Sequence, residues 1–524
     1  MTAGANVGAN VRTVIDRPVA ETVYGPVRGV DDGVVKVWRG IRYAAAPSGA
    51  LRWRAPQPPQ PWREVAEAAK VGPACPQPTD PRIPLDLGAR QGEDSLVLNV
   101  WAPSGTPPGA GKPVMVWVHG GAYVLGSSSQ PLYHGRALTS AGDVVVVTFN
   151  YRLGAFGFLD LSSFGSPFDS NPGLRDVLFA LHWVRDNIAA FGGDPDRITL
   201  FGESAGGSII TTLLTSPAAA GLFSAAIAQS SPATSVYDAA RGRRMAEQML
   251  DRLGIDHDQA HRLVDTPLPA ILRAAKRAFT EVPLQTPGTL AFAPIVDGDI
   301  VPDYPVSLAR EGKSHPVPLI IGTNEHEAAL FRWMRSPLLP ITPDAIRTMF
   351  ETIASEQPGL QMPSEADIVS AYRRKARPRT LGLHVARDVG FRMPSVWFAE
   401  GHDTVAPVYL YRFDWSTRLL RLLRLGAAHA TELPYMWGNL VGGPKDPTFK
   451  LGGLKDGRAV SQRMQRRWIN FATFGEPAAA GEPLWRPYRA EDRATLVIDK
   501  RDRVVTDLDR ELRMAWGDRV LNFR

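Results

Sequence analysis

The chain has 524 residues, of which 44% are hydrophobic and 21% charged, and it contains 48 glycines and 45 prolines. This is the composition of a turn-rich globular protein; with no Gly-X-Y period, long heptad run or polar low-complexity tract, collagen-like, coiled-coil and disordered chains are excluded. The net charge of +6 is modest and spread along the chain, which does not indicate nucleic-acid binding. The single cysteine, Cys75, excludes an intrachain disulfide and a cysteine-based metal cage and fits a reducing compartment.

No part of the sequence predicts export or membrane insertion. The first eleven residues lack the cationic start and the apolar core of a secretory signal. The longest apolar runs, such as residues 114–118, have the length of a strand and fall far below the roughly 20 residues of a membrane span. We therefore expect a cytoplasmic protein without an integral membrane segment.

Short runs of β-branched, aromatic or small apolar residues recur between turn signals and predict buried, largely parallel strands. These runs are residues 114–118, 144–149, 198–201, 225–228, 317–321, 408–411 and 496–498. Between the second and third, apolar residues at helical spacing from Leu174 to Ile188 are followed by Gly192 and Gly193, which predicts a crossover helix and a right-handed strand–helix–strand unit. Residues 250–291 and 341–397 carry helical patterns and proline punctuation, which predict an inserted helical cap.

The motif Gly202-Glu-Ser204-Ala205-Gly206 directly follows the strand predicted at 198–201 and opens an apolar helical run. A serine on so tight a turn projects above the sheet edge, and its neighbours must be small because backbone and helix crowd the turn. The backbone N–H of Ala205 would lie at the helix N-terminus, facing the oxygen that becomes negative when Ser204 attacks a carbonyl. The motif therefore predicts a nucleophile elbow, with a glycine-rich structural turn as the alternative.

A second glycine-rich motif, His119-Gly-Gly121-Ala122-Tyr123, follows the strand predicted at 114–118. Such a loop can present backbone N–H groups to a developing oxyanion. We expect Gly121 and Ala122 to donate to the oxyanion together with Ala205. His119 is expected to tie the loop down, with direct proton transfer as the alternative.

With these motifs the chain resembles the type-B carboxylesterase family of α/β-hydrolases, which includes bacterial p-nitrobenzyl-type esterases and cholinesterases. The resemblance runs from about Tyr24 to Val497. Besides the Ser204 motif, it rests on residues 40–44, 93–101, 119–123, 150–154, 191–195 and 296–298, and on Trp468 with Phe471. It implies an α/β-hydrolase fold, with a mostly parallel central sheet, helices on both faces and an inserted helical cap. Residues 17–520 would form a single domain and residues 1–16 a flexible N-terminus.

The same resemblance implies a complete catalytic triad. The family's acid falls at Glu327, with Glu325 as a rival whose other interpretation is an exposed, solvating side chain. The family's base falls at His429, just before the run Glu432-Leu-Pro-Tyr435. The order serine, acid and histidine along the chain is that of α/β-hydrolases.

Two further residues are expected to support the triad without contacting the reacting atoms. Ser230 matches a family serine that braces the acid, and Glu203 precedes the nucleophile. Leu290 and Phe292 fall where the family builds its acyl pocket, with simple core residues as the alternative.

The chain departs from the family around its cysteine. Ser95 stands where a partner for Cys75 often occurs, so Cys75 is expected to be an inert free thiol, with the loop at residues 76–94 held by packing alone. The loop has no tryptophan to bind a quaternary ammonium, so choline esters are not expected to be preferred substrates.

We therefore expect a serine carboxylesterase that hydrolyses uncharged small-molecule carboxylic esters to acid and alcohol through an acyl-enzyme, without metal or cofactor. An acyltransferase or an amide or carbamate hydrolase with the same triad stays open, as does, more remotely, a non-catalytic binding homologue. Family members with a similar Gly-Gly-Ala loop accept esters of bulky, even tertiary, alcohols, so the resemblance implies the same substrates here. Hydrolysis should rise with pH in a single step near the ordinary imidazole value of ~6.5, shifted by Glu327.

Two short basic runs interrupt the even spread of charge, at residues 373–377 and 418–425. In the second, Arg418, Arg421 and Arg424 recur every three residues among leucines. This pattern predicts either a weak contact with a lipid or anionic surface or a solvated helix face.

Overall fold

The computed structural model describes residues 17–79, 85–373, 378–442 and 446–524. The N-terminus predicted to be flexible, residues 1–16, and most of the first basic run, residues 374–377, lie outside this part of the chain. None of the helices that it contains is both long enough and apolar enough to cross a membrane.

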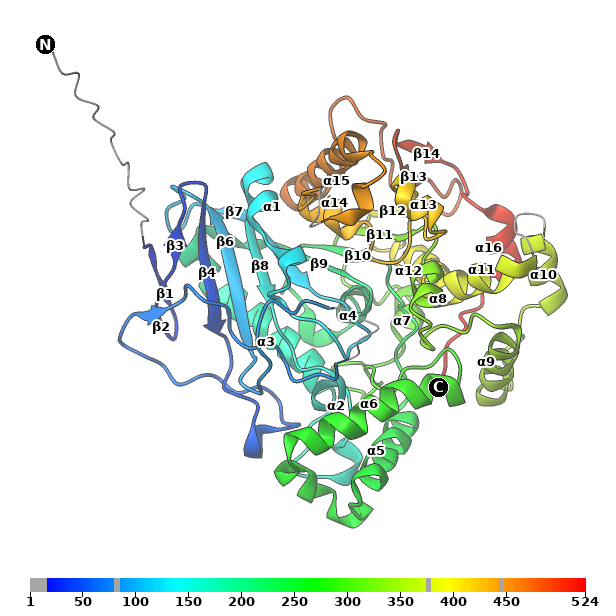
Figure 1. Ribbon diagram of the computed structural model, residues 1–524, viewed down its shortest axis with the longest axis horizontal. Coiled ribbons are helices and arrows are strands. Elements are labelled where there is room, and N and C mark those ends of the chain that lie inside the picture. Colours follow the sequence, from blue (N-terminus) through cyan, green and yellow to red (C-terminus); the bar gives the residue numbers. More distant parts are fainter. Residues whose placement is uncertain (1–16, 80–84, 374–377, 443–445) are drawn as a thin grey trace, which may run out of the picture.

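An 11-stranded sheet runs through the molecule in the order β14-β13-β12-β11-β10-β9-β7-β8-β6-β4-β3 (Figure 1). The stretch from β8 to β13 is parallel throughout, and each strand predicted from the sequence is one of its members. These strands are β7 (Lys112–Val118), β8 (Val145–Phe149), β9 (Gly193–Glu203), β10 (Ala225–Gln229), β11 (Leu319–Asn324), β12 (Val408–Phe413) and β13 (Thr495–Ile498). The predicted α/β class with a mostly parallel sheet is confirmed.

Antiparallel strands close the sheet at both ends, and the sequence analysis did not predict them. They are β3 (Val30–Asp31), β4 (Val35–Arg42) and β6 (Val97–Pro103) at one end and β14 (Arg503–Val505) at the other. A separate small sheet contains β1 (Val19–Thr22), β2 (Gly25–Arg28) and β5 (Ala66–Glu67).

Helices cover both faces of the large sheet, as the alternating directions of the side chains along β7 illustrate. Val114 and Val116 belong to one buried cluster and Met115 and Trp117 to another, because successive side chains of a strand point to opposite faces. The first cluster also takes in the helices α2 (Gly154–Gly157), α3 (Pro172–Asn187), α4 (Ala205–Leu213), α7 (Pro305–Arg310) and α12 (Met393–His402). The second takes in α1 (Arg136–Gly142), α14 (Leu433–Trp437) and α15 (Leu454–Phe474).

The predicted crossover helix is α3, which connects β8 to β9. Its last turn continues as a 3₁₀ turn and ends at Gly192, whose φ of 88° is readily adopted by glycine. The chain can therefore turn back into β9, the strand that leads to Ser204.

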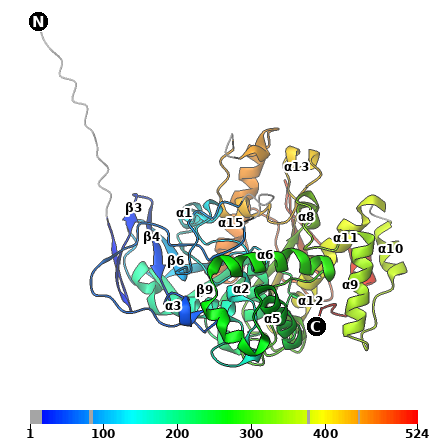
Figure 2. The same ribbon diagram turned by 60° about the horizontal axis from the view of Figure 1, so that its bottom comes forward.

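The predicted cap consists of helices inserted between the strands. The predicted ranges, 250–291 and 341–397, contain α6 (Leu268–Gln285), α9 (Pro343–Glu356), α10 (Glu365–Arg373) and α11 (Leu381–Arg387), followed by a π-helical turn at Asp388–Arg392. Two further helices were not predicted: α5 (Ala239–Leu253) begins before the first range, and α8 (Ala328–Trp333) lies before the second. In Figure 2, α6 crosses the middle of the molecule at the front with α5 below it, and α9 and α10 lie at the right-hand side. Two short helices, α13 (Arg418–Leu422) and α16 (Arg510–Trp516), complete the described fold.

Candidate active site

Ser204 occupies the turn between β9 and α4, with φ 58° and ψ −125°. This conformation is costly for a residue with a side chain, and such strain gathers at functional sites. The turn packs against the end of β7: a Cβ on Gly202 would lie 2.5 Å from the carbonyl oxygen of Val118, and one on Gly206 only 2.1 Å from it. Glycine is therefore required on both sides of Ser204, as the predicted elbow demands.

The loop after β7 lies beside this turn. Its Gly121 carbonyl accepts hydrogen bonds from the N–H groups of Val124 (3.0 Å) and Leu125 (2.9 Å), and Ala122 has a φ of 52°. Within the described residues, the N–H groups of Gly121, Ala122 and Ala205 have no acceptor. Ala122 and Ala205 line the same cavity as Ser204, whereas Gly121 is not among its lining residues.

His119 has the structural surroundings that the sequence analysis expected. It is fully buried, its ring stacks on Tyr151 at 4.6 Å between centroids, and its Nδ1 lies 2.9 Å from the carbonyl oxygen of Gly120. Burial lowers the pKa of His119 to about 4, so the ring is neutral at physiological pH.

Glu327 and His429 form a hydrogen-bonded pair across the end of the sheet. Nδ1 of His429 lies 2.6 Å from Oε2 of Glu327, and both side chains are buried. The other carboxylate oxygen, Oε1, accepts hydrogen bonds from the Ser230 hydroxyl (2.6 Å) and the Asn324 backbone N–H (2.7 Å). The carboxylate is thus fixed on three sides.

Glu325, the rival acid, lies apart from this pair. Its carboxylate is 3.4 Å from Nδ1 of His326, and 36% of its side chain is exposed. The structure therefore brings Glu327, and not Glu325, to the imidazole of His429.

The imidazole of His429 lies between two phenylalanines and a second carboxyl group. Its ring centroid is 4.5 Å from that of Phe391 and 5.3 Å from that of Phe331. Its Nε2 lies 3.1 Å from Oε1 of Glu203, while the hydroxyl of Ser204 makes no hydrogen bond within the described chain. Glu203, expected only to support the triad, thus faces the nitrogen that would accept the serine proton; catalytic hydrogen bonds often tighten only when substrate binds.

A third buried glutamate, Glu432, completes an acidic surrounding that the sequence analysis missed. Its Oε2 accepts a hydrogen bond from the Asn324 side chain (2.5 Å) and its Oε1 one from Gln229 (3.0 Å). Its position in the turn after His429 was the available signal, but the sequence does not show that this carboxyl is buried.

These carboxyls shift one another's protonation. Burial raises the pKa of Glu203 to about 8 and that of Glu432 to about 7. Burial lowers the pKa of His429, but the nearby carboxyls of Glu203 and Glu327 outweigh this and raise it to about 9. The site therefore holds protons more tightly than an isolated histidine, and its groups titrate together.

Cys75 matches the expectation, but the loop that follows it, at residues 76–94, differs from it in one respect. Cys75 is free and buried, and burial raises its pKa to about 12, which agrees with an inert thiol. The loop is not held by packing alone, however: the Gln77 side chain donates to the Gly126 carbonyl (2.8 Å) and accepts from the Gly126 N–H (2.8 Å). A buried amide therefore ties this loop to the glycine-rich loop after β7.

The cavity beside Ser204 encloses about 780 Å³ including its opening. Apolar side chains dominate its wall, and Leu290 is one of them. Phe292 is fully buried and is not among the lining residues, so it matches the alternative of a simple core residue.

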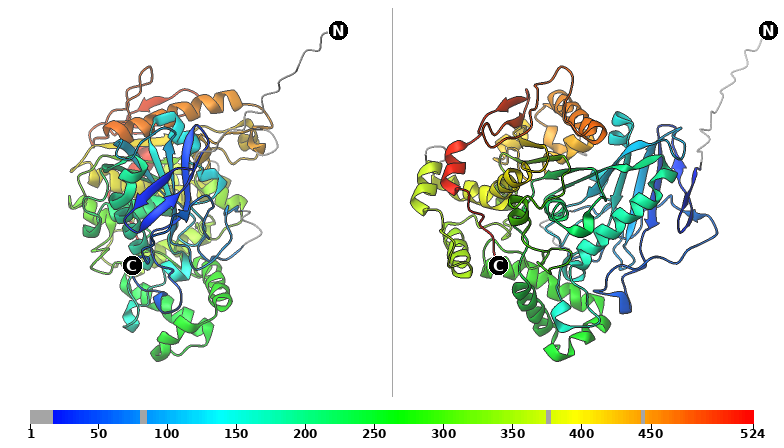
Figure 3. Two further views of the ribbon diagram at one scale, coloured as in Figure 1. Left: turned by 90° about the vertical axis from the view of Figure 1, so that its left-hand side faces the viewer. Right: turned by 180° about the vertical axis from the view of Figure 1, so that it is seen from behind.

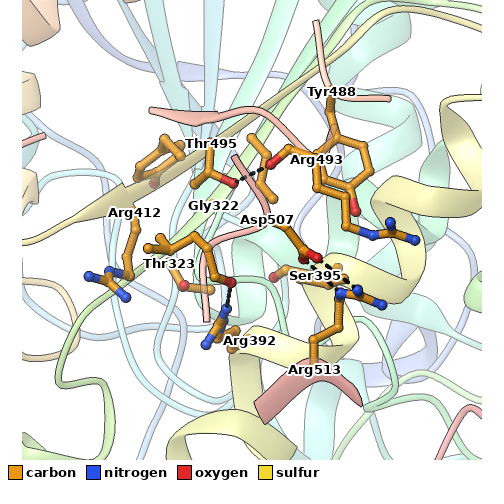
Figure 4. A pocket seen from close by; sticks show the side chains of 14 residues that line it. Gly322, Thr323, Arg392, Ser395, Arg412, Tyr488, Arg493, Thr495, Asp507 and Arg513 are labelled. Atoms are coloured by element: carbon orange, nitrogen blue, oxygen red, sulfur yellow. Dashed lines mark hydrogen bonds and ion pairs between the residues drawn. The ribbon is translucent and has the colours of Figure 1, made fainter. Parts of the chain in front are cut away.

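A smaller cavity of about 430 Å³ is lined by residues of β11 and β12 and is rich in arginine (Figure 4). Each arginine there already has an acidic partner. Arg513 pairs with Asp507, Arg392 and Arg412 share Asp509, and Arg493 pairs with Glu400. The charges of these arginines are compensated, and the described wall residues do not include a paired base and nucleophile. The cavity therefore has the features of a structural network of ion pairs.

Comparison with known proteins decides the family. Residues 16–516 match the model described as the carboxylesterase family. The chain belongs to the carboxylesterase family. It is 38% identical over 501 residues to the para-nitrobenzyl esterase of Bacillus subtilis, covering 94% of this chain and 97% of that protein. It is 34% identical to the phenmedipham hydrolase of Pseudarthrobacter oxydans, covering 95% and 98%, respectively.

Solved structures agree with the sequence relatives. A PNB esterase structure superposes with a TM-score of 0.81 at 36% identity, covering 96% of this chain and all of that one. A thermophilic PNB esterase gives a TM-score of 0.83 at 35% identity, covering 96% and 100%. This carboxylesterase therefore has the α/β-hydrolase fold and is a carboxylic ester hydrolase.

Proposed function

We propose that Ser204 is the nucleophile of this carboxylesterase, His429 its general base and Glu327 the acid that orients the base. One observation carries the proposal: the elbow presents Ser204 at a cavity, and the His429 ring, hydrogen-bonded to Glu327, packs against Phe331 and Phe391 of that cavity's wall. The unpartnered N–H groups of Ala122 and Ala205 there support their role as oxyanion donors, and Gly121 is proposed as the third donor.

In the proposed reaction, Oγ of Ser204 attacks the ester carbonyl carbon while its proton passes to Nε2 of His429. The carbonyl oxygen becomes negative and is stabilised by the backbone donors. When the tetrahedral intermediate collapses, the alcohol leaves with the proton from His429 and an acyl-enzyme remains. Water, deprotonated by the same imidazole, then attacks the acyl carbon and restores Ser204.

Uncharged carboxylic esters are the proposed substrates. Among the described residues that line the cavity there is no aspartate, glutamate, lysine, arginine or histidine. A charged group on the substrate would lose its hydration there without gaining an ion-pair partner, so the wall disfavours it. We also propose that residues 17–520 act as one catalytic domain, which the continuous 11-stranded sheet supports.

Covalent labelling tests the nucleophile. A fluorophosphonate should modify the wild-type protein once, and peptide mapping should find the label on the peptide that contains Ser204. The Ser204→Ala variant should not be labelled. A label on another residue would remove Ser204 from the mechanism. Turnover of matched ester, amide and carbamate substrates then measures which bond is preferred, and faster amide or carbamate cleavage would overturn the ester assignment.

We expect esters of tertiary alcohols to be hydrolysed. The carbonyl oxygens of both Gly120 and Gly121 are engaged within their own loop, by His119 and by the Val124 and Leu125 N–H groups, respectively. This arrangement supports the expectation of extra room at the alcohol side of the ester. The test compares tert-butyl and n-butyl acetate by acid release; brisk cleavage of the n-butyl ester with none of the tert-butyl ester contradicts it.

The rate should rise with pH, because only the neutral imidazole of His429 can accept the serine proton. The sequence analysis placed this step near ~6.5 with a shift from Glu327 alone. With the pKa of His429 raised to about 9, the rise in kcat/KM is expected at correspondingly higher pH. Glu203→Gln removes the carboxyl next to Nε2 and should therefore move the step to lower pH.

Pre-steady-state or initial-rate profiles of kcat/KM between pH 5 and 10 measure this shift. Glu325→Gln is the matched control, because Glu325 does not contact His429, and its profile should superpose on the wild type. A flat wild-type profile from pH 5 to 8, or a midpoint that Glu203→Gln leaves in place, would contradict the assignment of His429 as base.

The weak lipid contact predicted for the second basic run also stays a proposal. Leu422 and Leu423, at the end of α13, are 70% and 49% exposed, and Arg418 and Arg421 are exposed beside them. Exposed leucines next to cations suit an anionic lipid surface. Cosedimentation with phosphatidylserine-containing vesicles tests it, and equal recovery with and without vesicles would favour a solvated helix face.

A further inference from the structure

Two side chains from the segment at residues 518–524 line the cavity beside Ser204. Leu521 and Phe523 line the cavity although they follow Ser204 by more than 300 residues in the sequence, and they are only 2% and 7% exposed. A Cβ on Gly288 would lie 3.1 Å from the Met349 side chain and 3.2 Å from the Phe523 ring. Phe523, Met349 and the backbone at Gly288 therefore meet in one wall.

The path of this segment explains how it reaches the cavity. After α16 it runs past α9 towards α5, as the red trace that ends at the mark C shows from behind (Figure 3, right). The segment thus reaches α5 and α9, two helices that precede it by more than 150 residues in the sequence.

A set of polar contacts holds the segment in place. The Arg241 guanidinium, on α5, donates to the Arg524 carbonyl (2.7 Å) and lies over the rings of Phe523 (5.4 Å) and Tyr237 (5.1 Å). Arg241 also forms an ion pair with Glu356, whose other oxygen accepts the Arg524 N–H (2.9 Å). We call Arg241, Glu356 and Arg524 the latch.

The latch and the wall share a helix. The helix α9 supplies Met349 and Ile353 to the cavity and carries Glu356 at its end. The next residue, Gln357, donates to the Asn522 carbonyl (2.5 Å) between the two wall residues of the segment. Movement of the segment would therefore move the part of the cavity wall that Leu521 and Phe523 form.

We propose that Leu521 and Phe523 determine substrate specificity, by limiting the length of the apolar chain that the ester can place in the cavity, and that the latch fixes this limit. The inference rests on the proposed function, since it takes the Ser204 cavity as the substrate site. Neither residue belongs to the proposed triad or to the proposed oxyanion donors, so their substitution should change the choice among esters and not the chemistry.

Two substrate series test the proposal: p-nitrophenyl esters from butanoate to dodecanoate, and butanoate esters of alcohols of increasing length. The readout is the ratio of kcat/KM for a long ester to that for a short one, which does not depend on the fraction of active protein. Phe523→Ala should raise this ratio about tenfold in at least one series, which is the lower limit of the effect of one methylene in an apolar pocket. Phe523→Trp should lower it.

Matched control variants distinguish a specific effect of the wall residues on the ratio from general effects of substitution. Phe474→Ala removes an equal side chain that is 75% exposed on α15 and should leave the ratio unchanged. Arg241→Ala should broaden the chain-length preference, whereas Arg243→Ala, on the same helix and paired with Glu247, should not. Thermal melting identifies any variant that fails to fold, and Phe523→Leu, a smaller change, then replaces Phe523→Ala.

The outcomes distinguish the two proposals. If Ser204→Ala retains hydrolysis, the site itself is misassigned. A second outcome is that Ser204→Ala is inactive while the folded variants Phe523→Ala, Phe523→Trp and Leu521→Ala all keep the wild-type ratio within twofold in both series. In that case the specificity role of Leu521 and Phe523 is overturned, and the assignment of the active site is retained.

Discussion

Ser204→Ala is expected to lower kcat/KM for p-nitrophenyl butanoate by about four orders of magnitude or more. Without the hydroxyl no acyl-enzyme forms, and His429 has no nucleophile to activate. The residual rate would come from the backbone donors at Ala122 and Ala205, which would still stabilise the oxyanion of direct water attack. The measurement is an initial rate with protein expressed and purified in parallel with the wild type.

Ser208→Ala is the matched control for this loss. Ser208 lies one turn further along α4, is fully buried, and donates to the Pro232 carbonyl (3.2 Å). Its loss should affect stability more than turnover, so activity per folded molecule should stay within a few-fold of the wild type. A Ser204→Ala protein with wild-type kcat/KM would end the assignment of a serine mechanism to this cavity.

The parallel core of the fold was predictable from sequence because each of its strands is buried on both faces. Residues 114–118 of β7 illustrate this, since all five are apolar and fully buried. The strand β4 was missed because it lies near the antiparallel end of the sheet, where buried positions alternate irregularly with Lys36, Arg39 and Gly40. Its pattern therefore matches neither a buried strand nor a clean amphipathic one.

The parts of the site that lie within local sequence motifs could be predicted from the sequence. The turn around Ser204 and the loop at Gly121 are dictated by residues adjacent in sequence. The contact between Glu203 and Nε2 of His429, by contrast, joins residues more than 200 positions apart, and only the assembled sheet brings them together. The same holds for Glu432, whose partners Gln229 and Asn324 lie on β10 and β11.

The cavity wall formed by Leu521 and Phe523 is another part of the site that could not be predicted from the sequence. Nothing in the local sequence marks these residues as substrate contacts, because their exposure and neighbours depend on α5 and α9. Specificity in this carboxylesterase is thus proposed to come from segments that no catalytic motif includes.

Glu327→Gln should lower kcat/KM on the order of 10⁴-fold, although it changes the shape of the side chain very little. Oε1 of Glu327 accepts hydrogen bonds from Ser230 and from the Asn324 N–H, so the amide oxygen of a glutamine would take that position. The amide NH₂ would then face Nδ1 of His429.

Nδ1 would have to accept this hydrogen bond, which places the imidazole proton on Nε2. In that tautomer Nε2 cannot take the Ser204 proton, so the general base is lost while the fold is retained. Loss of the negative charge also removes one of the two main influences that raise the pKa of His429, so the residual activity should show its pH step at lower pH than the wild type. A merely structural glutamate would not move that step.

Glu325→Gln provides the comparison within the same loop, since it makes the identical chemical change two residues away. Its carboxylate is partly exposed and contacts His326 instead of His429. Its kcat/KM should therefore stay within a few-fold of the wild type. The reverse pattern, with Glu325→Gln inactive and Glu327→Gln active, would transfer the acid's role to Glu325 and would require the loop after β11 to adopt a different conformation during catalysis.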